Sequence, residues 1–355
     1  MENPQRLRLL AEILPQWYAE HARSLPWRKD RDPYHVWLSE IMLQQTRVEA
    51  VKGYYARFLA AVPDIPALAR ADPELLHKLW EGLGYYARVR NLQKAAQLLL
   101  TRHNGRFPGD YAAVRALPGI GDYTAGAICS ICFDLPTPAV DGNVLRVVTR
   151  LRADGRCVDE PAVKRGLREE LAEVYPPQGA GLLTQALMEL GATVCGPNGK
   201  PDCEHCPAAA FCAARDGDAW ANYPLRAKKR ERRVERRTVF VFSREGTLAL
   251  KKRRATGLLA GLWEFPNVPD WLEPQQALEL ASEWGLHPRG LERQTERTHV
   301  FTHVQWEMRC FYIPCAAPGE GFLWADEAAL KGQYALPTAF RMFRPGQETN
   351  IKGER

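Results

Sequence analysis

The sequence predicts an all-α N-terminal domain followed by a smaller α+β domain. Apolar residues recur at helical spacing through most of residues 4–215, and few runs there alternate with a period of two. From Thr238 onward the runs are rich in β-branched and aromatic residues, which favours strands. A chain of 355 residues is also long for one hydrophobic core, so two domains are expected.

In the first domain, segments with helical periodicity are separated by turn-forming residues. Prolines such as those in Asp72-Pro73 and Pro176-Pro177 mark the places where one helix ends and another begins. The expected helices are 6–20, 34–61, 73–82, 89–102, 110–116, 122–133, 143–153, 161–174 and 179–194.

A basic segment, expected at residues 216–237, separates the two halves. Its last part, 226–237, contains eight Arg or Lys and two Glu. Such a run is typical of a solvated linker, because like charges repel and keep the chain open. It also suits nucleic-acid phosphates, and one segment can serve both purposes.

The second domain combines short strands with one helix. The expected strands are 238–243, 247–253, 298–313 and 321–326, and the expected helix is 274–285. The last residues, 346–355, are expected to form a loose tail.

Composition favours a folded intracellular protein. Apolar residues make up 46% of the chain, and a net charge of +6 favours a polyanionic partner. The sequence contains no signal-peptide pattern and no run of about eighteen apolar residues, so no membrane association is expected.

The nine cysteines are an odd number, and four of them crowd together in the sequence at Cys195, Cys203, Cys206 and Cys212. In a reducing compartment such a cluster indicates a metal site rather than disulfides. The spacing C-x7-C-x2-C-x5-C fits either zinc or a [4Fe–4S] cluster. A pair of C-x2-C knuckles is not present, which weakens the case for a zinc ribbon without excluding zinc.

Residues 117–144 combine a glycine-rich turn, an apolar helix and a polar turn. The turn at 118–121 presents free backbone N–H groups at the start of a helix, which suits a phosphate. No Walker lysine follows, so a contact with a DNA backbone is a better interpretation than a nucleotide loop. Asp141 is either a helix N-cap or an acid beside the bound substrate.

Glu40 lies in an apolar stretch, residues 36–46. If its helix face is buried, desolvation raises the carboxyl pKa and suits the group to general acid catalysis. The alternative is an exposed glutamate on an amphipathic helix. Glu40 and Asp141 together, with the glycine turn, indicate a site more strongly than either alone.

Aromatic, guanidinium and amide groups near these carboxylates are suited to contact bases. Tyr85 follows a Gly-Leu-Gly turn and precedes arginines, so it is either a wedge between bases or a core residue. Trp27, Arg28 and Gln45 flank the Glu40 helix, where they could read a base edge.

These motifs resemble those of a known enzyme family. LPGIGDYTAGA (117–127) resembles the helix-hairpin-helix of base-excision DNA glycosylases, VDGNV (140–144) contains that superfamily's aspartate, and the four cysteines resemble its iron–sulfur loop. LPWR, SEIMLQQTRVE, EGLGYYARVRNL and TQALMELGATVC narrow the resemblance to adenine DNA glycosylases of the MutY type. GLLAGLWEFP (257–266) and HVFTH (299–303) resemble that family's Nudix-like module.

The resemblance implies an all-α N-terminal helix-hairpin-helix glycosylase domain at residues 1–215 and an α+β Nudix-like C-terminal domain at 238–345. The hairpin would occupy 117–128 and the [4Fe–4S] loop 195–212, with the basic linker at 216–237 between the domains.

The resemblance also implies the catalytic groups. Glu40 would protonate N7 of adenine, and Asp141 would stabilise or capture the oxocarbenium-like sugar, as the second carboxylate of a retaining glycosidase does. Tyr123 and Asn143 would position the sugar, the water and the carboxylates. Relatives that also cleave the strand carry a lysine in place of Tyr123, and a phenol cannot form their Schiff base. A monofunctional glycosylase is therefore expected.

The resemblance also implies which residues of this chain contact the bases. The flipped adenine would lie against Trp27, Arg28 and Gln185. Gln45 and Tyr85 would fill or wedge the stack around the opposing base.

The family's other DNA contacts fall on both domains. Phe301, Thr302 and His303 would recognise 8-oxoguanine opposite the adenine. Gly119 and Gly121 would hold a backbone phosphate, with a monovalent cation on the hairpin carbonyls.

Three departures from the family pattern affect these expectations. Seven residues rather than six separate Cys195 from Cys203, which a bulge in the Gly-Pro-Asn-Gly loop can absorb. Thr302 replaces the usual serine and keeps its hydroxyl. Residues 257–280 contain no REXXEE run, so the second domain should recognise a base rather than hydrolyse nucleotides.

The expected activity is the removal of adenine mispaired with 8-oxoguanine, and with G, from duplex DNA. The protein is expected to be a monomer, cytoplasmic and nucleoid-associated if bacterial. One alternative is a non-catalytic DNA-binding protein, against which Glu40 and Asp141 in their motifs argue. Another is a lyase acting on thymine glycol or apurinic sites, against which Tyr123 and the second domain argue.

Overall fold

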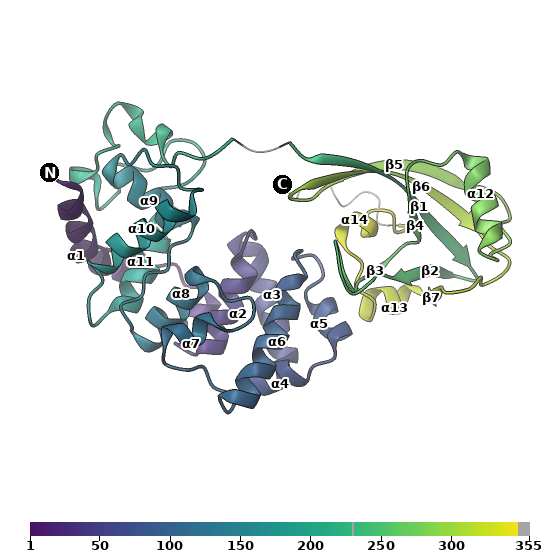
Figure 1. The fold of residues 1–355 in the computed structure, drawn as a ribbon, viewed down its shortest axis with the longest axis horizontal. Helices are drawn as coiled ribbons and strands as arrows, with labels where there is room; N and C mark the ends of the chain where they lie inside the picture. The colour runs from purple at the N-terminus through teal and green to yellow at the C-terminus, as the bar shows by residue number, and fades with distance from the viewer. Residues whose placement is uncertain (229–230, 347–355) are drawn as a thin grey trace. The chain divides into compact units, whose positions relative to one another are not determined.

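The computed structural model describes residues 1–228 and 231–346 of the chain (Figure 1). Residues 229–230 of the expected basic linker and residues 347–355 of the expected tail lie outside the described residues. Within the described residues, no helix has the length and apolar character needed to cross a membrane.

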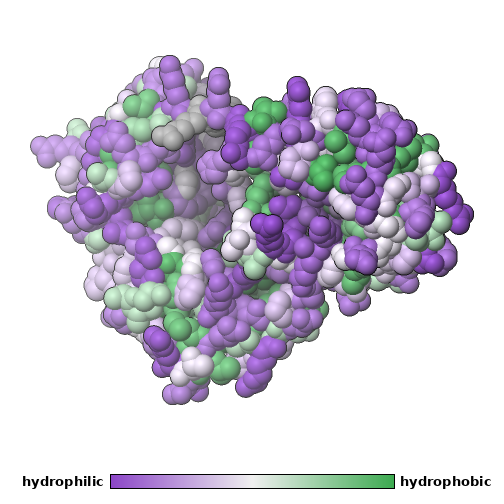
Figure 2. Space-filling view, turned by 45° about the vertical axis from the view of Figure 1, so that its right-hand side comes forward, coloured by the Kyte–Doolittle hydropathy of each residue, from purple (hydrophilic) through white to green (hydrophobic). Residues whose placement is uncertain are grey.

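The chain divides into two compact units. The first unit contains residues 1–70 and 91–228, and the second contains residues 71–90 and 231–346. The face drawn in Figure 2 is mostly hydrophilic, with hydrophobic residues scattered in small groups, so the apolar side chains are gathered largely in the cores.

Helices make up the regular structure of the first unit, in agreement with the predicted fold class. They begin where the sequence places caps: the Asp32 carboxylate accepts a hydrogen bond from Tyr34 N at 2.8 Å, with Pro33 at the first helical position. The elements are α1 (Asn3–His21), η1 (Pro26–Arg28), α2 (Pro33–Leu43), α3 (Val48–Ala61), α4 (Ile65–Arg70), α6 (Ala87–Arg102), α7 (Tyr111–Arg115), α8 (Asp122–Phe133), α9 (Gly142–Arg152), α10 (Pro161–Ala172), α11 (Ala180–Thr193), η2 (Ala209–Phe211) and η3 (Asp216–Asn222), of which α6 begins in the second unit.

One expected helix was wrong in extent. The run 34–61 is not one helix, because α2 ends at Leu43 and α3 begins at Val48. Gln45 between them has a φ of 61°, in the left-handed region that a continuing α-helix cannot adopt. The break turns the chain immediately after the Glu40 helix.

Helix α11 lies at the centre of the first unit, packed against α1, α8 and α9. Two glycines let its neighbours approach closely. A Cβ at Gly181 would lie 2.6 Å from the Ser130 carbonyl oxygen of α8, and a Cβ at Gly191 would lie 2.7 Å from Cβ of Asn143 in α9. The start of α9 is therefore held directly against α11.

The second unit is built on a seven-stranded sheet of order β3-β2-β1-β6-β5, with β4 paired to β1 and β7 paired to β2. Its strands are β1 (Arg233–Arg244), β2 (Thr247–Lys252), β3 (Trp263–Glu264), β4 (Asn267–Pro269), β5 (Arg293–Val300), β6 (Val304–Pro314) and β7 (Leu323–Ala325). Its helices are α5 (Pro73–Leu79), α12 (Pro274–Glu283), α13 (Glu327–Gly332) and α14 (Thr338–Arg341).

Aromatic residues fill both faces of the sheet. Phe240, Phe242 and Phe311 pack with α12 on one face. Trp306 and Phe340 belong to the cluster on the other face, together with residues of α13 and α14.

Two expectations for the second unit are corrected. Strand β1 begins at Arg233, inside the expected linker of 216–237, because it pairs in parallel with β6 from Arg233 opposite Val304. The expected strand 298–313 is instead the end of β5, a turn at 301–303 and most of β6, since the two strands pair antiparallel.

Residues 71–90 belong to the second unit, although the sequence predicted them to be part of the helical domain of 1–215. Helix α5 is held there by polar contacts. Trp263 Nε1 donates to the Glu74 carboxylate at 3.0 Å, and Leu336 N donates to Glu81 Oε1 at 2.8 Å. Lys78 Nζ donates to the Leu330 carbonyl at 2.9 Å.

Candidate active site

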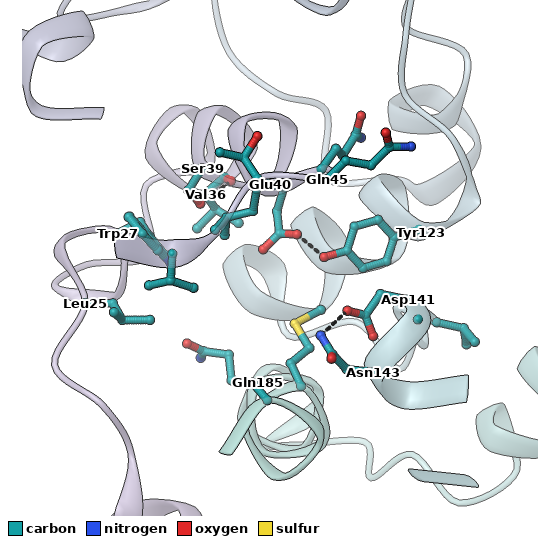
Figure 3. Close-up of a pocket in the computed structure, with 18 of the residues that line it drawn as sticks. Leu25, Trp27, Val36, Ser39, Glu40, Gln45, Tyr123, Asp141, Asn143 and Gln185 are labelled. Atoms are coloured by element: carbon teal, nitrogen blue, oxygen red, sulfur yellow. Dashed lines mark hydrogen bonds between the residues drawn. The ribbon is translucent and has the colours of Figure 1, made fainter. Parts of the chain in front are cut away.

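A pocket of about 650 Å³ in the first unit gathers side chains from η1, α2, α8, α9 and α11 (Figure 3). Its lining includes these predicted site residues: Trp27, Arg28, Glu40, Gln45, Tyr123, Asp141, Asn143 and Gln185. Segments separated by more than a hundred residues in the sequence thus meet around one cavity.

Glu40 is buried in this pocket, with 6% of its surface exposed. Burial raises the pKa of the Glu40 carboxyl to about 7, because the charged form loses its hydration. The hydrogen bond from Tyr123 opposes this shift, the Asp141 charge adds to it, and the Arg28 charge opposes it. A carboxyl group with this pKa is partly protonated near neutral pH.

Tyr123 lies in the first turn of α8, directly after the glycine-rich hairpin. Its hydroxyl donates a hydrogen bond to Glu40 Oε2 (Figure 3). Burial and the neighbouring carboxylates raise the pKa of Tyr123 well above that of a free phenol. The side chain therefore remains a protonated donor.

Asp141 is the N-cap of α9, which confirms the first interpretation of this residue, and it also lines the pocket. Its Oδ1 accepts from Val144 N at 2.7 Å. Its Oδ2 accepts from Asn143 Nδ2 at 2.7 Å (Figure 3). The pKa of Asp141 is raised overall, mainly by burial, although these hydrogen bonds and the Arg146 charge lower it in part.

Arg146, which sequence reasoning missed, connects the pocket to the cysteine loop. Its Nη2 donates to Asn143 Oδ1 and to the Gly191 carbonyl, both at 2.8 Å, and its Nε donates to the Cys195 carbonyl at 2.7 Å. The only signal in the sequence is an arginine three residues after Asn143, and a surface position would produce the same spacing.

The wall opposite the Tyr123 side is formed by η1 and α11. Trp27 is buried, with its ring edge-on to Tyr55 at 5.5 Å between centroids. Arg28 Nη2 donates to Glu189 Oε2 at 2.8 Å, and Tyr18 O–H donates to Gln185 Oε1 at 3.2 Å. Tyr18 and Glu189 were also missed, because each lies behind the wall.

The glycine-rich hairpin has the conformation that its sequence predicts. Gly119 has a φ of 77°, and a Cβ there would lie 2.6 Å from Asn91 Cβ, so no other residue fits without strain. Gly121 is the N-cap of α8 and faces open space. Arg115 Nη1 donates to the Ile120 carbonyl at 3.0 Å and braces the turn.

Cys195, Cys203, Cys206 and Cys212 line one small cavity of about 30 Å³, and none forms a disulfide. Arg150 Nη1 lies 3.4 Å from Cys195 Sγ. Among the described residues, no three His, Cys, Asp or Glu side chains converge as ligands of one ion. Four thiol groups around one cavity are a donor set that suits either a zinc ion or an iron–sulfur cluster.

In the second unit, the predicted lesion-contacting residues come together. Phe301 packs edge-on against Trp306, with centroids 4.8 Å apart. The Tyr85 and Thr302 hydroxyls are hydrogen-bonded at 2.8 Å, although Tyr85 remains about half exposed. His303 closes the turn, where its carbonyl accepts from the first residue of β1 at 3.3 Å.

Comparison with known proteins assigns the family. The model described as "HhH-GPD superfamily base excision DNA repair protein" matches residues 38–175, and the NUDIX domain model matches residues 238–344. The adenine DNA glycosylase of Mus musculus is 34% identical over 96% of this chain and 79% of its own length. The chain belongs to the adenine DNA glycosylases. The adenine DNA glycosylase of Homo sapiens is 34% identical over 96% of this chain and 75% of its own length. The adenine DNA glycosylase of Buchnera aphidicola subsp. Acyrthosiphon pisum is 30% identical over 83% of this chain and 83% of its own length.

Solved structures agree with this assignment for the helical part of the adenine DNA glycosylase. A thermostable thymine-DNA glycosylase matches with a TM-score of 0.54 and 25% identity, covering 59% of this chain and 97% of its own. A trapped endonuclease III–DNA covalent intermediate, at 23% identity and a TM-score of 0.51, shares the fold. The predicted fold class and family are confirmed: the chain is a base-excision repair enzyme that hydrolyses an N-glycosyl bond and acts on DNA.

Proposed function

We propose that this adenine DNA glycosylase removes adenine mispaired with 8-oxoguanine, and more slowly adenine opposite G, from duplex DNA. The observation that carries the mechanism is the buried Glu40 carboxyl, whose pKa is raised to about 7 in a pocket that also contains Asp141. A group with that pKa can donate a proton at neutral pH, and the second carboxylate can balance the positive charge that develops on the sugar.

The chemical step follows from these two carboxyl groups. The flipped adenine accepts the Glu40 proton at N7, and the electron pair of the C1′–N9 bond leaves with the base. The ionised Asp141 stabilises the oxocarbenium-like sugar or bonds to it at C1′. Water then adds at C1′ and gives its proton to Glu40, which restores the acid.

Tyr123 and Asn143 hold the carboxylates rather than transfer protons in this scheme. Tyr123 bonds to Glu40, and Asn143 bonds to Asp141 at 2.7 Å. Tyr123 is also the reason to expect at most weak strand cleavage, because a phenol does not form a Schiff base with the sugar. Borohydride should trap little covalent DNA complex, and Tyr123→Lys is the positive control.

The pocket volume of about 650 Å³ is ample for a purine, and extrusion of the base into it fits glycosylase chemistry. Trp27, Arg28 and Gln185 are assigned to the adenine face. Gln45, in the left-handed turn after α2, is assigned to the space that the flipped base leaves.

The opposing 8-oxoguanine is assigned to Tyr85 and to the loop of Phe301, Thr302 and His303. The hydrogen bond between Tyr85 and Thr302 supports this assignment, because it joins two side chains, far apart in the sequence, that the resemblance places beside the same opposing base. Gly119 and Gly121 are assigned to a backbone phosphate and to a monovalent cation on the hairpin carbonyls.

The four cysteines are assigned to a [4Fe–4S] cluster. When bound, the cluster supplies a rigid crosslink for the loop 195–212 and a centre able to exchange an electron. Arg146 would couple the position of that loop to the Asn143 side chain, because it donates hydrogen bonds to both the Cys195 carbonyl and Asn143 Oδ1.

A single-turnover assay tests the proposal. Duplexes carrying adenine opposite 8-oxoguanine, G or C are mixed with excess enzyme, and free adenine is measured. We expect the fastest release opposite 8-oxoguanine and the slowest opposite C. Thr302→Val should reduce the preference for 8-oxoguanine over G by about tenfold, the effect of one hydrogen bond. Equal release from all three duplexes would contradict the lesion specificity.

A further inference from the structure

Part of the basic linker packs on the first unit, against the loop between α9 and α10. The Leu225 carbonyl accepts from Val158 N at 3.0 Å, and Val158 is fully buried in the core. The Asp159 carboxylate accepts from Ala227 N and from Arg226 Nη1, each at 3.0 Å. These contacts fix the position of the linker on the same unit that contains the active-site pocket.

Arg226 lines that pocket, and so does Lys164 in the first turn of α10. The Arg226 side chain is 53% exposed, and Lys164 is also exposed. Because they are exposed, both groups lie at the mouth of the pocket rather than deep inside it. A guanidinium has five N–H donors and an ammonium has three, so both keep donors for a ligand.

The other cations of the pocket are held by a buried carboxylate. Among the described residues that line it, the remaining basic side chains are Arg23 and Arg28. They form ion pairs with Glu189 at 2.7 and 2.8 Å, and the Glu189 side chain is fully buried. Lys164 and Arg226 are therefore the positive charges that a polyanion meets at the mouth.

Extruding a nucleotide moves its backbone as well as its base. The flanking phosphates then approach a pocket that contains Glu40 and Asp141, whose carboxyl groups repel phosphate when ionised. Gly119 and Gly121, which are assigned to a backbone phosphate, do not line this pocket. Positive charge at the mouth would offset the repulsion, and guanidinium and ammonium groups form strong, charge-assisted hydrogen bonds with phosphate.

We propose that Lys164 and Arg226 bind the phosphates that flank the extruded nucleotide, so that the basic linker forms part of the DNA-binding surface of the first unit. This inference rests on the proposed placement of the flipped base in the pocket. Asp159 is a positioning residue, since it holds Arg226 and the backbone of the next residue. Phosphate contacts read no base, so they should serve adenine opposite 8-oxoguanine, G or C equally.

Binding to DNA with one uncharged phosphate tests the assignment. The duplex carries 2′-fluoroadenosine opposite 8-oxoguanine, because the fluorine disfavours an oxocarbenium-like sugar and keeps the adenine in place. A methylphosphonate replaces the phosphate on the 5′ or the 3′ side of that nucleotide, and affinity is measured by fluorescence anisotropy. In about 0.1 M salt, wild type should lose about five- to tenfold in affinity for at least one of the two, the effect of about one counterion fewer released.

Lys164→Ala and Arg226→Ala should each bind the unmodified 2′-fluoroadenosine duplex about five- to tenfold more weakly than wild type. For each variant, a methylphosphonate at the phosphate that its side chain contacts should cause no further loss, because the charge pair is already broken. Arg165→Ala and Lys228→Ala are the matched controls, since both residues are exposed and neither lines the pocket. Both controls should keep the full methylphosphonate effect.

Arg226→Lys keeps the charge and should restore most of the affinity, which a loss of folding would not allow. Additive losses for both alanine variants at both phosphates, or no methylphosphonate effect in wild type, would overturn the inference. Either result leaves adenine excision intact, because single-turnover release at saturating enzyme measures the chemical step separately. A wild type that releases no adenine would instead refute the proposed function.

Discussion

Removal of the Tyr123 hydroxyl should move the pH dependence of catalysis to higher pH. The hydroxyl donates to Glu40 Oε2 and so stabilises the carboxylate, which lowers the pKa of Glu40. Tyr123→Phe keeps the buried ring and removes this bond alone. Burial and the Asp141 charge then act on the Glu40 pKa with only the Arg28 charge opposing them.

The size of the change follows from the strength of the bond. A hydrogen bond to a charged group contributes about 1.5–3 kcal/mol, and each pKa unit corresponds to about 1.36 kcal/mol. The pKa of Glu40 should therefore rise from about 7 by about one to two units. The protonated form is the active one, so the rate is present below the pKa and lost as pH rises through it.

Single-turnover rates between about pH 5.5 and 9.5 measure this limb. In wild type the rate should fall about tenfold per pH unit above a midpoint near 7. In Tyr123→Phe the midpoint should lie about one to two units higher, with a lower plateau because Glu40 is less well held. A midpoint unchanged or shifted to lower pH would refute the assignment of Glu40 as the acid.

Three further predictions concern stability and composition. In the folded protein the pKa of Glu40 is about 7, above its ordinary value of 4.5. The free energy of unfolding should therefore fall as the pH rises from about 4.5 to about 7, because the buried carboxyl group resists ionisation. Glu40→Gln removes this cost and should stabilise the protein at pH 8 by about 3 kcal/mol, measured by chemical denaturation. Gly191→Ala should destabilise the protein by about 1–3 kcal/mol and slow adenine release, because the new Cβ would lie 2.7 Å from Asn143 Cβ. The control is Gly166→Ala in α10, where the new Cβ would meet only the end of the Arg156 side chain at 3.9 Å, so the change should be neutral or stabilising. Purified protein should contain about four iron and four sulfide, and Cys206→Ser should lose most of both; zinc in place of iron would contradict the cluster assignment.

The sequence predicted the residues that line the pocket better than the residues that hold them in place from behind. Glu40 could be proposed as an acid because its neighbours in the chain are apolar, and burial at 6% exposure follows from that local pattern. Asp141 and Asn143 are close in sequence, so their pairing across one helix start is a local property as well.

The supports depend on contacts between distant segments, which periodicity does not encode. Tyr18 and Gln185 are 167 residues apart, and Arg146 reaches Cys195 across 49. The helix periodicity of α5 was recognised, but its membership of the second unit depends on polar contacts such as that of Glu74 with Trp263. Composition alone marks the turn at 301–303 as strand, because its residues continue an aromatic and β-branched run.

The most direct test of the proposed mechanism is adenine release by wild type, Glu40→Gln and Asp141→Asn from a duplex with adenine opposite 8-oxoguanine. We expect one adenine per active enzyme for wild type and almost none for either variant, with DNA binding retained by both. Release by Glu40→Gln at the wild-type rate would contradict it.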